Sequence, residues 1–523
     1  MKKYNFYQNE PVDSIVQIIE RSQKLYGSSV AIKFKVKKKI VEKTYNDLLA
    51  DSLNCAENLI VNFPEAKHIA ILGASSYEWI ITYLGTIFAG LVIVPLDKEL
   101  TSKELAEEIS QADVDCLVFD NEYLDIAEQI TNKIGVAGIN FSSLFDFLTD
   151  INVVLPIVNP DKLSTIVFTS GTTGKSKRVM LTQRNISANV LQGLGAVNVK
   201  HNKDVIMSVL PLNHAYEFTC TVLGMIYKGV TICISSGLKY FQRELKEYRP
   251  TVMFVVPMIA EKLYSKIEST VAENNKESAF NFATNLTRFF YKINIDISKL
   301  LLKDVNESLG GNLRILMCGG APLNENLIKK YNGIGINMFQ GYGLTECSPL
   351  LTVNFDYYHR PGSVGKVVDG CEVKCVNGEI WAKGVSISNG YYKDDEETEK
   401  SFSEGWFKTG DLGYVDKDGF VFIRGRKKNL IIMDNGKNVS AEELEEMLYK
   451  IPYVSEALVY GQNNLITAEI YIDKEMHQIT DKQLQSEIEK INDTLPTYKN
   501  INKIIHRETP FEKTANKKIK RIG

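Results

Sequence analysis

Short hydrophobic runs alternate with longer amphipathic stretches up to about residue 400 of the chain. The runs are rich in Ile, Val and Leu, and they lie at 68–72, 91–94, 116–119, 205–209, 252–256 and 314–317. Continuous apolar runs of this length are typical of strands that are buried on both faces of a sheet, with helices between them. The pattern therefore predicts an α/β fold whose large N-terminal region consists of layered α/β subdomains with largely parallel sheets.

The pattern of apolar and polar residues changes beyond residue 362. Glycines separate short alternating segments there, namely Gly362, Gly365, Gly370, Gly378, Gly384 and Gly390. Such spacing predicts a small β-rich subdomain. Residues 427–523 then form a small α+β lid, with a first helix at 441–451 that has Ser440 as N-cap and acidic residues in its first turn. The predicted domains are therefore 1–426 and 427–523.

One segment imitates a membrane span. Residues 79–96 contain no charged side chain, but they include Gly85, Gly90 and Pro95 and lie within an otherwise soluble pattern. A buried helix that runs into a buried strand at 91–94 explains the segment better than a transmembrane helix.

Length and composition narrow the class of protein. A chain of 523 residues exceeds one typical core, so two or more domains are expected. The net charge of −3 gives no case for nucleic acid as a partner, and the first eight residues lack the apolar core of a secretory signal. Eight cysteines are sparse, and Cys371 with Cys375 is a weak metal signal without a second pair beside it. We therefore expect a cytoplasmic protein with reduced thiols.

Residues 169–178, Thr-Ser-Gly-Thr-Thr-Gly-Lys-Ser-Lys-Arg, combine hydroxyls, two glycines and three cations. Strand-like runs at 164–168 and 179–181 flank them, so a loop between two strands is predicted. Its glycines let the backbone approach a bulky anion, whose oxygens N–H groups, hydroxyls and cations can bind. A Walker A loop has four residues between its glycines and a helix after its lysine, whereas only two residues separate Gly171 from Gly174. Taken alone, the segment fits a solvated turn equally well.

The segment resembles the phosphate loop of the adenylate-forming superfamily, which contains acyl-CoA synthetases, luciferases and the adenylation domains of peptide synthetases. Further motifs of that superfamily follow in the same order. They are Leu-Pro-Leu-Asn-His-Ala-Tyr-Glu at 210–217, Gln-Gly-Tyr-Gly-Leu-Thr-Glu at 340–346, Gly-Trp-Phe-Lys-Thr-Gly-Asp at 405–411, Arg-Gly-Arg-Lys-Lys-Asn-Leu-Ile-Ile at 424–432, Gly-Lys-Asn-Val at 436–439 and Lys-Thr-Ala-Asn-Lys-Lys-Ile-Lys-Arg at 513–521. One such motif is a weak signal, but the ordered set is highly specific and extends over essentially the whole chain.

The resemblance implies a reaction in two halves. A carboxylate attacks the α-phosphate of ATP and displaces pyrophosphate, and the acyl-adenylate then passes its acyl group to a thiol. Such chemistry depends mainly on positioning and on neutralising charge. The residues implied to hold the β- and γ-phosphates are Thr169, Ser170, Gly171, Thr172, Thr173, Gly174 and Lys177. The loop departs from the family pattern at Ser176, where proline is usual, and at Arg178, where glycine is usual, but neither change removes a phosphate donor.

By the same resemblance, three further groups of residues bind the nucleotide. The Glu346 carboxylate is assigned to Mg²⁺, a hard cation that prefers oxygen ligands, and Thr345 to the α-phosphate. Tyr342 offers an aromatic face to adenine, and Gln340 offers an amide to its polar edge. Other residues assigned to ATP or AMP are Gly320, Ala321, Gly341 and Gly343, together with Asp411 and Arg426 at the ribose hydroxyls.

The C-terminal motif places Lys518 at the position of the family's catalytic lysine. Its ammonium would bridge the attacking carboxylate and an α-phosphate oxygen, which damps the repulsion between two anions. Lys517 stands where the family usually has glycine and is the fallback if the register is shifted, while a solvated basic tail is the alternative without function.

Three further residues follow from the resemblance. His214 is expected near the acyl carboxylate, where it rearranges between the half-reactions. Lys428 matches the hinge of a mobile lid. Gly436 matches a glycine that lines the thiol tunnel and leaves space for a pantetheine arm.

Two motifs bear on the acid. Amino-acid-activating relatives have an aspartate early in the segment that corresponds to 210–217, but this chain has no acid there before Glu217. That segment and Cys-Gly-Gly-Ala-Pro-Leu at 318–323 most resemble long-chain fatty acyl-CoA synthetases, with Gly319 and Gly320 leaving space for an acyl tunnel. The implied enzyme is an AMP-forming ligase that joins a medium- or long-chain fatty acid to coenzyme A.

Two other functions stay open at this point. One is an enzyme that loads the phosphopantetheine of an acyl carrier protein, or that activates an aryl acid. The other is a non-catalytic nucleotide-binding module, which the altered Ser176, Arg178 and Lys517 motivate but which would not need the full set of intact site residues. The implied cofactors are ATP, Mg²⁺ and coenzyme A. The expected partner is a small carboxylic acid, with no nucleic acid and no transmembrane segment, and peripheral contact with a membrane stays compatible with the sequence.

Overall fold

A computed structural model describes residues 5–146, 153–169, 176–291, 295–433, 437–462, 465–472, 480–512, 519 and 521. The chain forms two compact units. The first consists of Met1–Glu372 and Ala382–Phe407, and the second of Val373–Trp381 and Lys408–Gly523. The β-rich region beyond residue 362 is thus shared between the two units. The predicted boundary at residue 426 was placed from the sequence motifs instead. That domain boundary stays a prediction.

A six-stranded sheet in the first unit contains the two strands between which the phosphate loop lies in the sequence. Its order is β6 (Ala137–Asn140), β5 (Cys116–Phe119), β3 (His68–Leu72), β4 (Val92–Pro95), β7 (Leu163–Thr169) and β8 (Lys177–Thr182). All neighbours pair in parallel except β7 and β8, which are antiparallel. The helices along this part of the chain include α2 (Tyr45–Asn62), α4 (Ser102–Gln111), α5 (Leu124–Ile134) and α7 (Gln183–Leu194).

The uncharged segment 79–96 is a buried helix followed by a buried strand, as predicted. Helix α3 (Tyr77–Phe88) buries every residue except Glu78 and leads into β4. It has 12 residues, so it is too short to cross a bilayer. Across the described part of the chain, no helix is both long enough and apolar enough to span a membrane.

The first unit also contains part of a 14-stranded sheet, and this part carries the motifs at 210–217, 318–323 and 340–346. Its order is β15 (Gly365–Val367), β14 (Leu350–Val353), β13 (Asn337–Gly343), β12 (Ile315–Cys318), β11 (Val252–Val255), β9 (Val205–Ser208), β10 (Thr231–Ile234), β1 (Val30–Val36) and β2 (Lys39–Thr44). The strands from β13 to β1 are parallel, and the outer strands are antiparallel. Associated helices include α9 (Phe241–Tyr248), α10 (Pro257–Glu273), α11 (Glu277–Tyr291) and α14 (Glu325–Gly333). Parallel strands end at one sheet edge, so the residues that follow β12 and β13 emerge close together.

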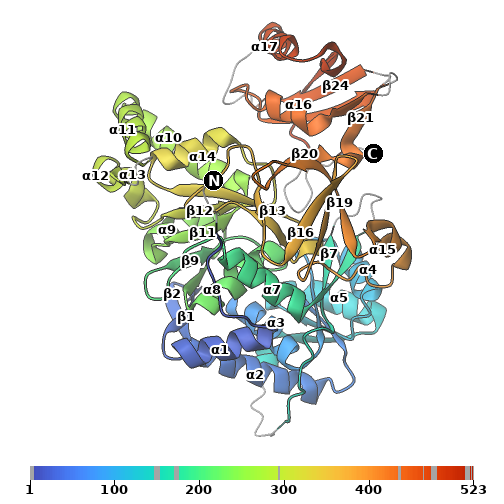
Figure 1. Cartoon of the computed structure of the whole chain (residues 1–523). Coiled ribbons are helices and arrows are strands. Elements are labelled where there is room, and N and C mark those ends of the chain that lie inside the picture. Colours follow the sequence, from blue (N-terminus) through green and yellow to red (C-terminus); the bar gives the residue numbers. More distant parts are fainter. Residues whose placement is uncertain are drawn as a thin grey trace. The chain divides into compact units, whose positions relative to one another are not determined.

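The second unit contains the hairpin of β19 (Trp406–Val415) and β20 (Phe420–Arg426) and a small α+β module (Figure 1). The module consists of β21 (Leu430–Ile432), β22 (Asn438–Ser440), α16 (Ala441–Leu448), β23 (Glu456–Gln462), β24 (Leu465–Tyr471), α17 (Asp481–Asp493) and β25 (Lys503–Arg507). The Ser440 hydroxyl accepts the N–H of Glu443, which confirms the predicted N-cap of α16. Leu444, Val459 and Ile488 belong to a core of its own. The α+β character of this region is therefore as predicted.

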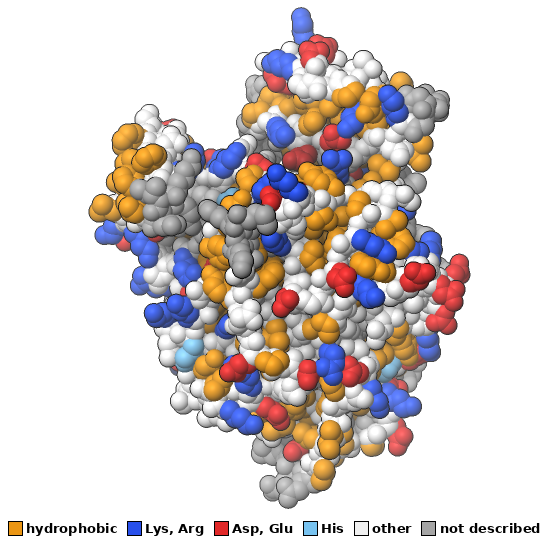
Figure 2. All heavy atoms as spheres, in the orientation of Figure 1, with side chains coloured by type: hydrophobic (Ala, Val, Ile, Leu, Met, Phe, Trp, Pro, Cys, Tyr) orange, Lys and Arg blue, Asp and Glu red, His pale blue; other side chains and the backbone are white. Residues whose placement is uncertain are grey.

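The sequence contains 61 basic and 64 acidic residues, so neither sign of charge should dominate the surface. On the face shown in Figure 2, side chains of both signs are interspersed.

Candidate active site

The phosphate loop lies between two paired strands. Thr169 at the end of β7 pairs with Lys177 at the start of β8, so the chain turns back on itself within a few residues. A strand therefore follows the lysine, as predicted, where a Walker A loop would have a helix. The predicted phosphate ligands Ser170, Gly171, Thr172, Thr173 and Gly174 lie outside the described residues.

Both departures from the family pattern at the end of this loop have acidic partners. The Ser176 hydroxyl hydrogen-bonds to the buried Glu108 carboxyl on α4. The Arg178 guanidinium lies 3.4 Å from Asp394, the N-cap of α15 (Asp395–Ser401). These partners hold the end of the loop where the family relies on proline and glycine.

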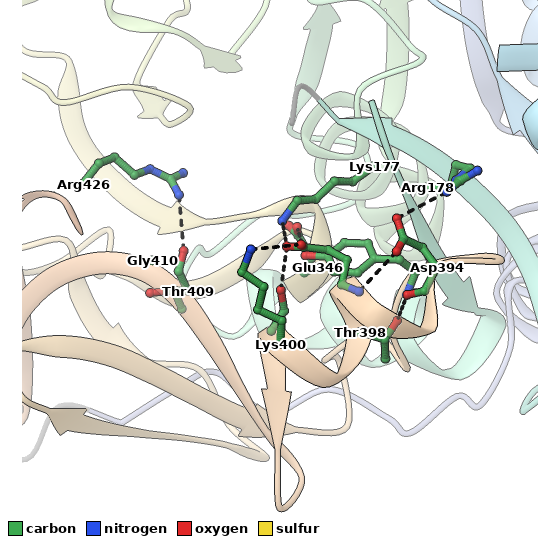
Figure 3. A network of polar contacts seen from close by, with 12 residues as sticks. Lys177, Arg178, Glu346, Asp394, Thr398, Lys400, Thr409, Gly410 and Arg426 are labelled. Atoms are coloured by element: carbon green, nitrogen blue, oxygen red, sulfur yellow. Dashed lines mark hydrogen bonds and ion pairs between the residues drawn. The ribbon is translucent and has the colours of Figure 1, made fainter. Parts of the chain in front are cut away.

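The side chain of Lys177 contacts two side chains from one other segment of the chain, Glu397 and Tyr391. Its Nζ lies 2.5 Å from Oε1 of Glu397 and 4.9 Å from the ring centroid of Tyr391 (Figure 3). Burial opposes ionisation of Glu397, but the hydrogen bond and charge of Lys177 outweigh it and lower the pKa of the carboxyl. Glu397 and Tyr391 therefore orient Lys177, a predicted phosphate ligand.

Glu346 lies on a single helical turn, Thr345–Cys347, directly after β13. Its side chain is buried, and its Oε1 accepts a hydrogen bond of 2.9 Å from the Tyr391 hydroxyl. Magnesium is usually held by one or two carboxylates together with substrate phosphates and water, so a single fixed carboxylate beside a phosphate loop fits that cation. The described residues contain no cluster of three or more His, Cys, Asp or Glu side chains that would suit a metal held by the protein alone.

Two glycines let β13 pass close to β14. A Cβ at Gly343 would lie 1.8 Å from the Pro349 carbonyl oxygen, and one at Gly341 would lie 2.9 Å from the Leu350 side chain. Tyr342 between them is half-buried. The Gln340 amide donates to the Ser363 carbonyl at 2.9 Å, so in this structure it fixes the strand end.

The turn after β12 meets the motif at 210–217. A Cβ at Gly319 would lie 3.1 Å from the Tyr216 ring, whose hydroxyl donates to the Met317 carbonyl at 3.1 Å. Gly320 has a φ of +81°, a conformation that favours glycine, and both Gly320 and Ala321 are exposed. The glycine pair thus admits an aromatic ring against the backbone.

His214 precedes a π-helix, Tyr216–Leu223, and is half-buried. A π-helical turn often occurs at a functional site. The fully buried Glu217 accepts hydrogen bonds from Ser208, Val209 and Thr221. Burial raises the pKa of Glu217 to about 7 against the effect of these donors. Its contacts join the end of β9 to the turn that carries His214.

The ribose motif is assembled within the second unit. Asp411 on β19 pairs with Arg426 on β20, and Nε of Arg426 lies 2.8 Å from Oδ1 of Asp411. Arg426 also donates to the Thr409 carbonyl at 3.2 Å (Figure 3). Asp411 is buried and Arg426 is half-buried. The structure thus brings these two predicted residues together.

The remaining predicted residues belong to the second unit. Lys428 is exposed on a single turn, Lys427–Asn429, directly after β20. Gly436, Lys517 and Lys518 lie outside the described residues.

Known families and proteins match nearly the whole chain. A family model described as AMP-binding enzyme matches residues 19–392, and a model of the AMP-binding enzyme C-terminal domain matches residues 428–522. The chain belongs to the AMP-binding enzyme family. The long-chain-fatty-acid–CoA ligase FadD15 of Mycobacterium bovis is 30% identical over 78% of this chain and 73% of that protein. The long-chain-fatty-acid–CoA ligase ACSBG1 of Mus musculus is 28% identical over 89% of this chain and 72% of that protein.

Solved structures of AMP-binding enzymes share the fold. The o-succinylbenzoate CoA synthetase of Bacillus subtilis, in complex with its acyl-adenylate intermediate, superposes with a TM-score of 0.78 at 22% identity over 96% of each chain. ATP-bound MatB from Rhodopseudomonas palustris gives a TM-score of 0.78 at 24% identity over 95% of this chain and 96% of that one. The predicted fold class is confirmed, with a large N-terminal α/β region and a small C-terminal domain.

Family membership establishes the type of reaction. This AMP-binding enzyme is an AMP-forming acid–thiol ligase, which activates a carboxylic acid to acyl-AMP and then transfers the acyl group to a thiol.

The sequence did not reveal Glu108, Tyr391, Asp394 and Glu397, the residues that hold the predicted site residues in place. No local motif marks them, because each lies far along the chain from the site residue that it contacts. The shortest distance in sequence, between Tyr391 and Glu346, is 45 residues.

Glu108→Gln should change how stability depends on pH. Burial raises the pKa of Glu108 from its ordinary value of 4.5 to about 8, so the folded protein holds a proton that the unfolded chain releases between these values. The stability that this group contributes is complete below pH 4.5 and is lost as pH rises through 8. Glutamine cannot titrate, so the variant should gain on the wild type by up to about 5 kcal/mol across this window, because each pKa unit corresponds to about 1.4 kcal/mol.

Urea unfolding at a series of pH values measures this difference. The control is Glu107→Gln, which removes an exposed carboxylate from the same helix. Parallel stability curves for Glu108→Gln and the wild type would contradict the assignment.

Proposed function

We propose that this protein is a fatty acid–coenzyme A ligase for a medium- or long-chain acid. The observation that supports the chemistry is the contact of one buried side chain, Tyr391, with both the proposed phosphate-binding Lys177 and the proposed cation-binding Glu346. The similarity to long-chain-fatty-acid–CoA ligases over about three quarters of the chain supports the acid.

In the first half-reaction, a carboxylate oxygen of the acid attacks the α-phosphorus of ATP. The bond from that phosphorus to the bridging oxygen breaks, and pyrophosphate leaves with the electron pair. Lys177 and the loop after Thr169 bind the departing phosphates, and Lys518 neutralises the two anions that converge. Glu346 would hold Mg²⁺, which supplies charge neutralisation on the phosphates. Thr345 contacts the α-phosphate, and Asp411 with Arg426 binds the ribose.

In the second half-reaction, the thiol of coenzyme A attacks the acyl carbonyl of the adenylate. A carbon–sulfur bond forms, AMP leaves, and the thiol proton passes to solvent. The lid turns about Lys428, which withdraws Lys518 and brings Gly436 to the pantetheine arm. His214 lies near the acyl carboxylate and rearranges between the two steps.

The acid is proposed on two features of the first unit. No carboxylate precedes Glu217 in the segment that would meet the α-amine of an amino acid. Glu217 itself is fully buried and accepts hydrogen bonds from three donors, so it serves the fold and does not bind substrate.

The eight free cysteines support a reducing, cytoplasmic location.

Pyrophosphate release with a panel of acids tests the proposal. The panel contains fatty acids of increasing chain length, aryl acids and amino acids, each assayed with coenzyme A or with a phosphopantetheinylated acyl carrier protein. We expect release with fatty acids and a thioester product on coenzyme A. A preference for the carrier protein or for aryl acids would favour those alternatives, and ATP binding without release for every acid would favour a non-catalytic module.

A further inference from the structure

Tyr391 touches two residues of the proposed nucleotide site at once. Its hydroxyl donates to Oε1 of Glu346 at 2.9 Å, and its ring centroid lies 4.9 Å from the Lys177 ammonium. The side chain is buried, with 2% exposure, and is among the largest fully buried side chains of the protein. One aromatic side chain thus connects the proposed metal-binding carboxylate with the proposed phosphate-binding lysine.

The backbone holds Tyr391 on both sides of this connection. An isolated β-bridge pairs Tyr391 with Val179 of β8, only two residues after Lys177. On the other side, the Ser388 N–H donates to the Glu346 carbonyl at 2.8 Å. The Thr398 hydroxyl also accepts the N–H of Tyr391 at 3.0 Å. The ring and its hydroxyl therefore have little freedom to move relative to either partner.

We propose that Tyr391 is a positioning residue that fixes the Glu346 carboxylate for a divalent cation bound with ATP. This inference rests on the proposed role of Glu346. Groups that hydrogen-bond to a metal ligand orient it, and their loss typically weakens metal binding 10- to 100-fold. With Oε1 engaged by the phenol, the carboxylate presents its second oxygen in one orientation.

The phenol is suited to act as a permanent donor. Its hydroxyl donates directly to Glu346, which as an ionised carboxylate can only accept, so the phenol is the donor of this bond. The ring face attracts the Lys177 ammonium by a cation–π interaction, which depends on the ring alone. The hydroxyl and the ring therefore serve different partners and can be separated by mutation.

The test compares Tyr391→Phe with the adjacent Tyr392→Phe. The first removes the hydroxyl from Glu346 and keeps the ring beneath Lys177. The second removes a hydroxyl of the same kind that donates to the exposed Asp113 at 2.7 Å, so it is a matched control. ATP binding is measured by calorimetry at stepwise Mg²⁺ concentrations, with Mn²⁺ binding followed by electron paramagnetic resonance as a readout that needs no turnover.

We expect Tyr391→Phe to need about 10- to 100-fold more Mg²⁺ for the same ATP affinity, and to regain most of its kcat at saturating Mg²⁺. Tyr392→Phe should follow the wild type. A Mg²⁺ requirement of Tyr391→Phe equal to that of the wild type would overturn the inference. So would a loss that no Mg²⁺ concentration restores, because a purely structural role predicts that result.

Glu346→Gln separates this inference from the proposed function. If Glu346→Gln keeps the wild-type Mg²⁺ dependence, Glu346 is not the metal ligand and the proposed role of that residue fails, together with the inference. If Glu346→Gln raises the Mg²⁺ requirement and Tyr391→Phe does not, only the inference fails.

Discussion

Lys518→Ala should reduce adenylate formation by about 10²–10³-fold, the usual cost of one electrostatic donor at the reacting centre. ATP binding should remain largely intact, because the lysine acts on charge that converges only during the attack. Transfer from a supplied acyl-adenylate to the thiol should survive, since the turned lid withdraws this residue. Pyrophosphate exchange measures the first step, and thioester formation from the synthetic adenylate measures the second.

Lys517→Ala is the matched control and should be mild in both assays. If it is the severe variant, the register of the terminal motif is shifted by one residue. If neither variant matters, the chain end is a solvated tail and the mechanism loses its central residue.

Described residues before and after this segment make contacts within the second unit. Phe511 is buried, and its N–H donates to Glu456 at 2.7 Å. Beyond the segment, the Arg521 guanidinium lies 2.5 Å from Glu445 and donates to the Val459 carbonyl at 3.1 Å.

Asp411→Asn should raise KM for ATP by about 10- to 100-fold, with a smaller change in kcat. A hydrogen bond to a charged group contributes about 1.5–3 kcal/mol, and the amide keeps the shape of the carboxylate while losing its charge. Because these bonds form in the ground state and persist in the transition state, the loss should fall mainly on KM. Arg426 is half-buried and can regain water when its partner loses charge.

Deoxy analogues of ATP identify the cause of that loss. The wild type should discriminate strongly against 2′-deoxy- and 3′-deoxy-ATP, because each lacks a hydroxyl that Asp411 would bind. The variant should discriminate much less. A variant that rejects the deoxy analogues as strongly as the wild type would show that Asp411 acts elsewhere.

Local pattern predicted those parts of the fold that depend on neighbouring residues. The apolar run at 68–72 coincides with β3, because a short continuous run of this kind is typical of a strand that is buried between two layers. The N-cap Ser440 was legible because capping joins residues that are three apart. The loop after Thr169 was predicted as a turn between strands because both flanks are strand-like runs. The motif order predicted the family and the type of reaction, which the comparisons confirm, whereas the roles of the site residues stay predictions.

The tertiary structure decided how those residues are held. Glu108 meets Ser176, Glu397 meets Lys177 and Tyr391 meets Glu346 only because strand pairing and helix docking bring distant segments together. It also decided that the hairpin of β19 and β20 packs with the C-terminal unit. A sequence pattern records which face of an element is apolar, but not which distant element will cover it. The chemistry of the site was therefore encoded locally, whereas the contacts that orient it follow from the topology of the sheets.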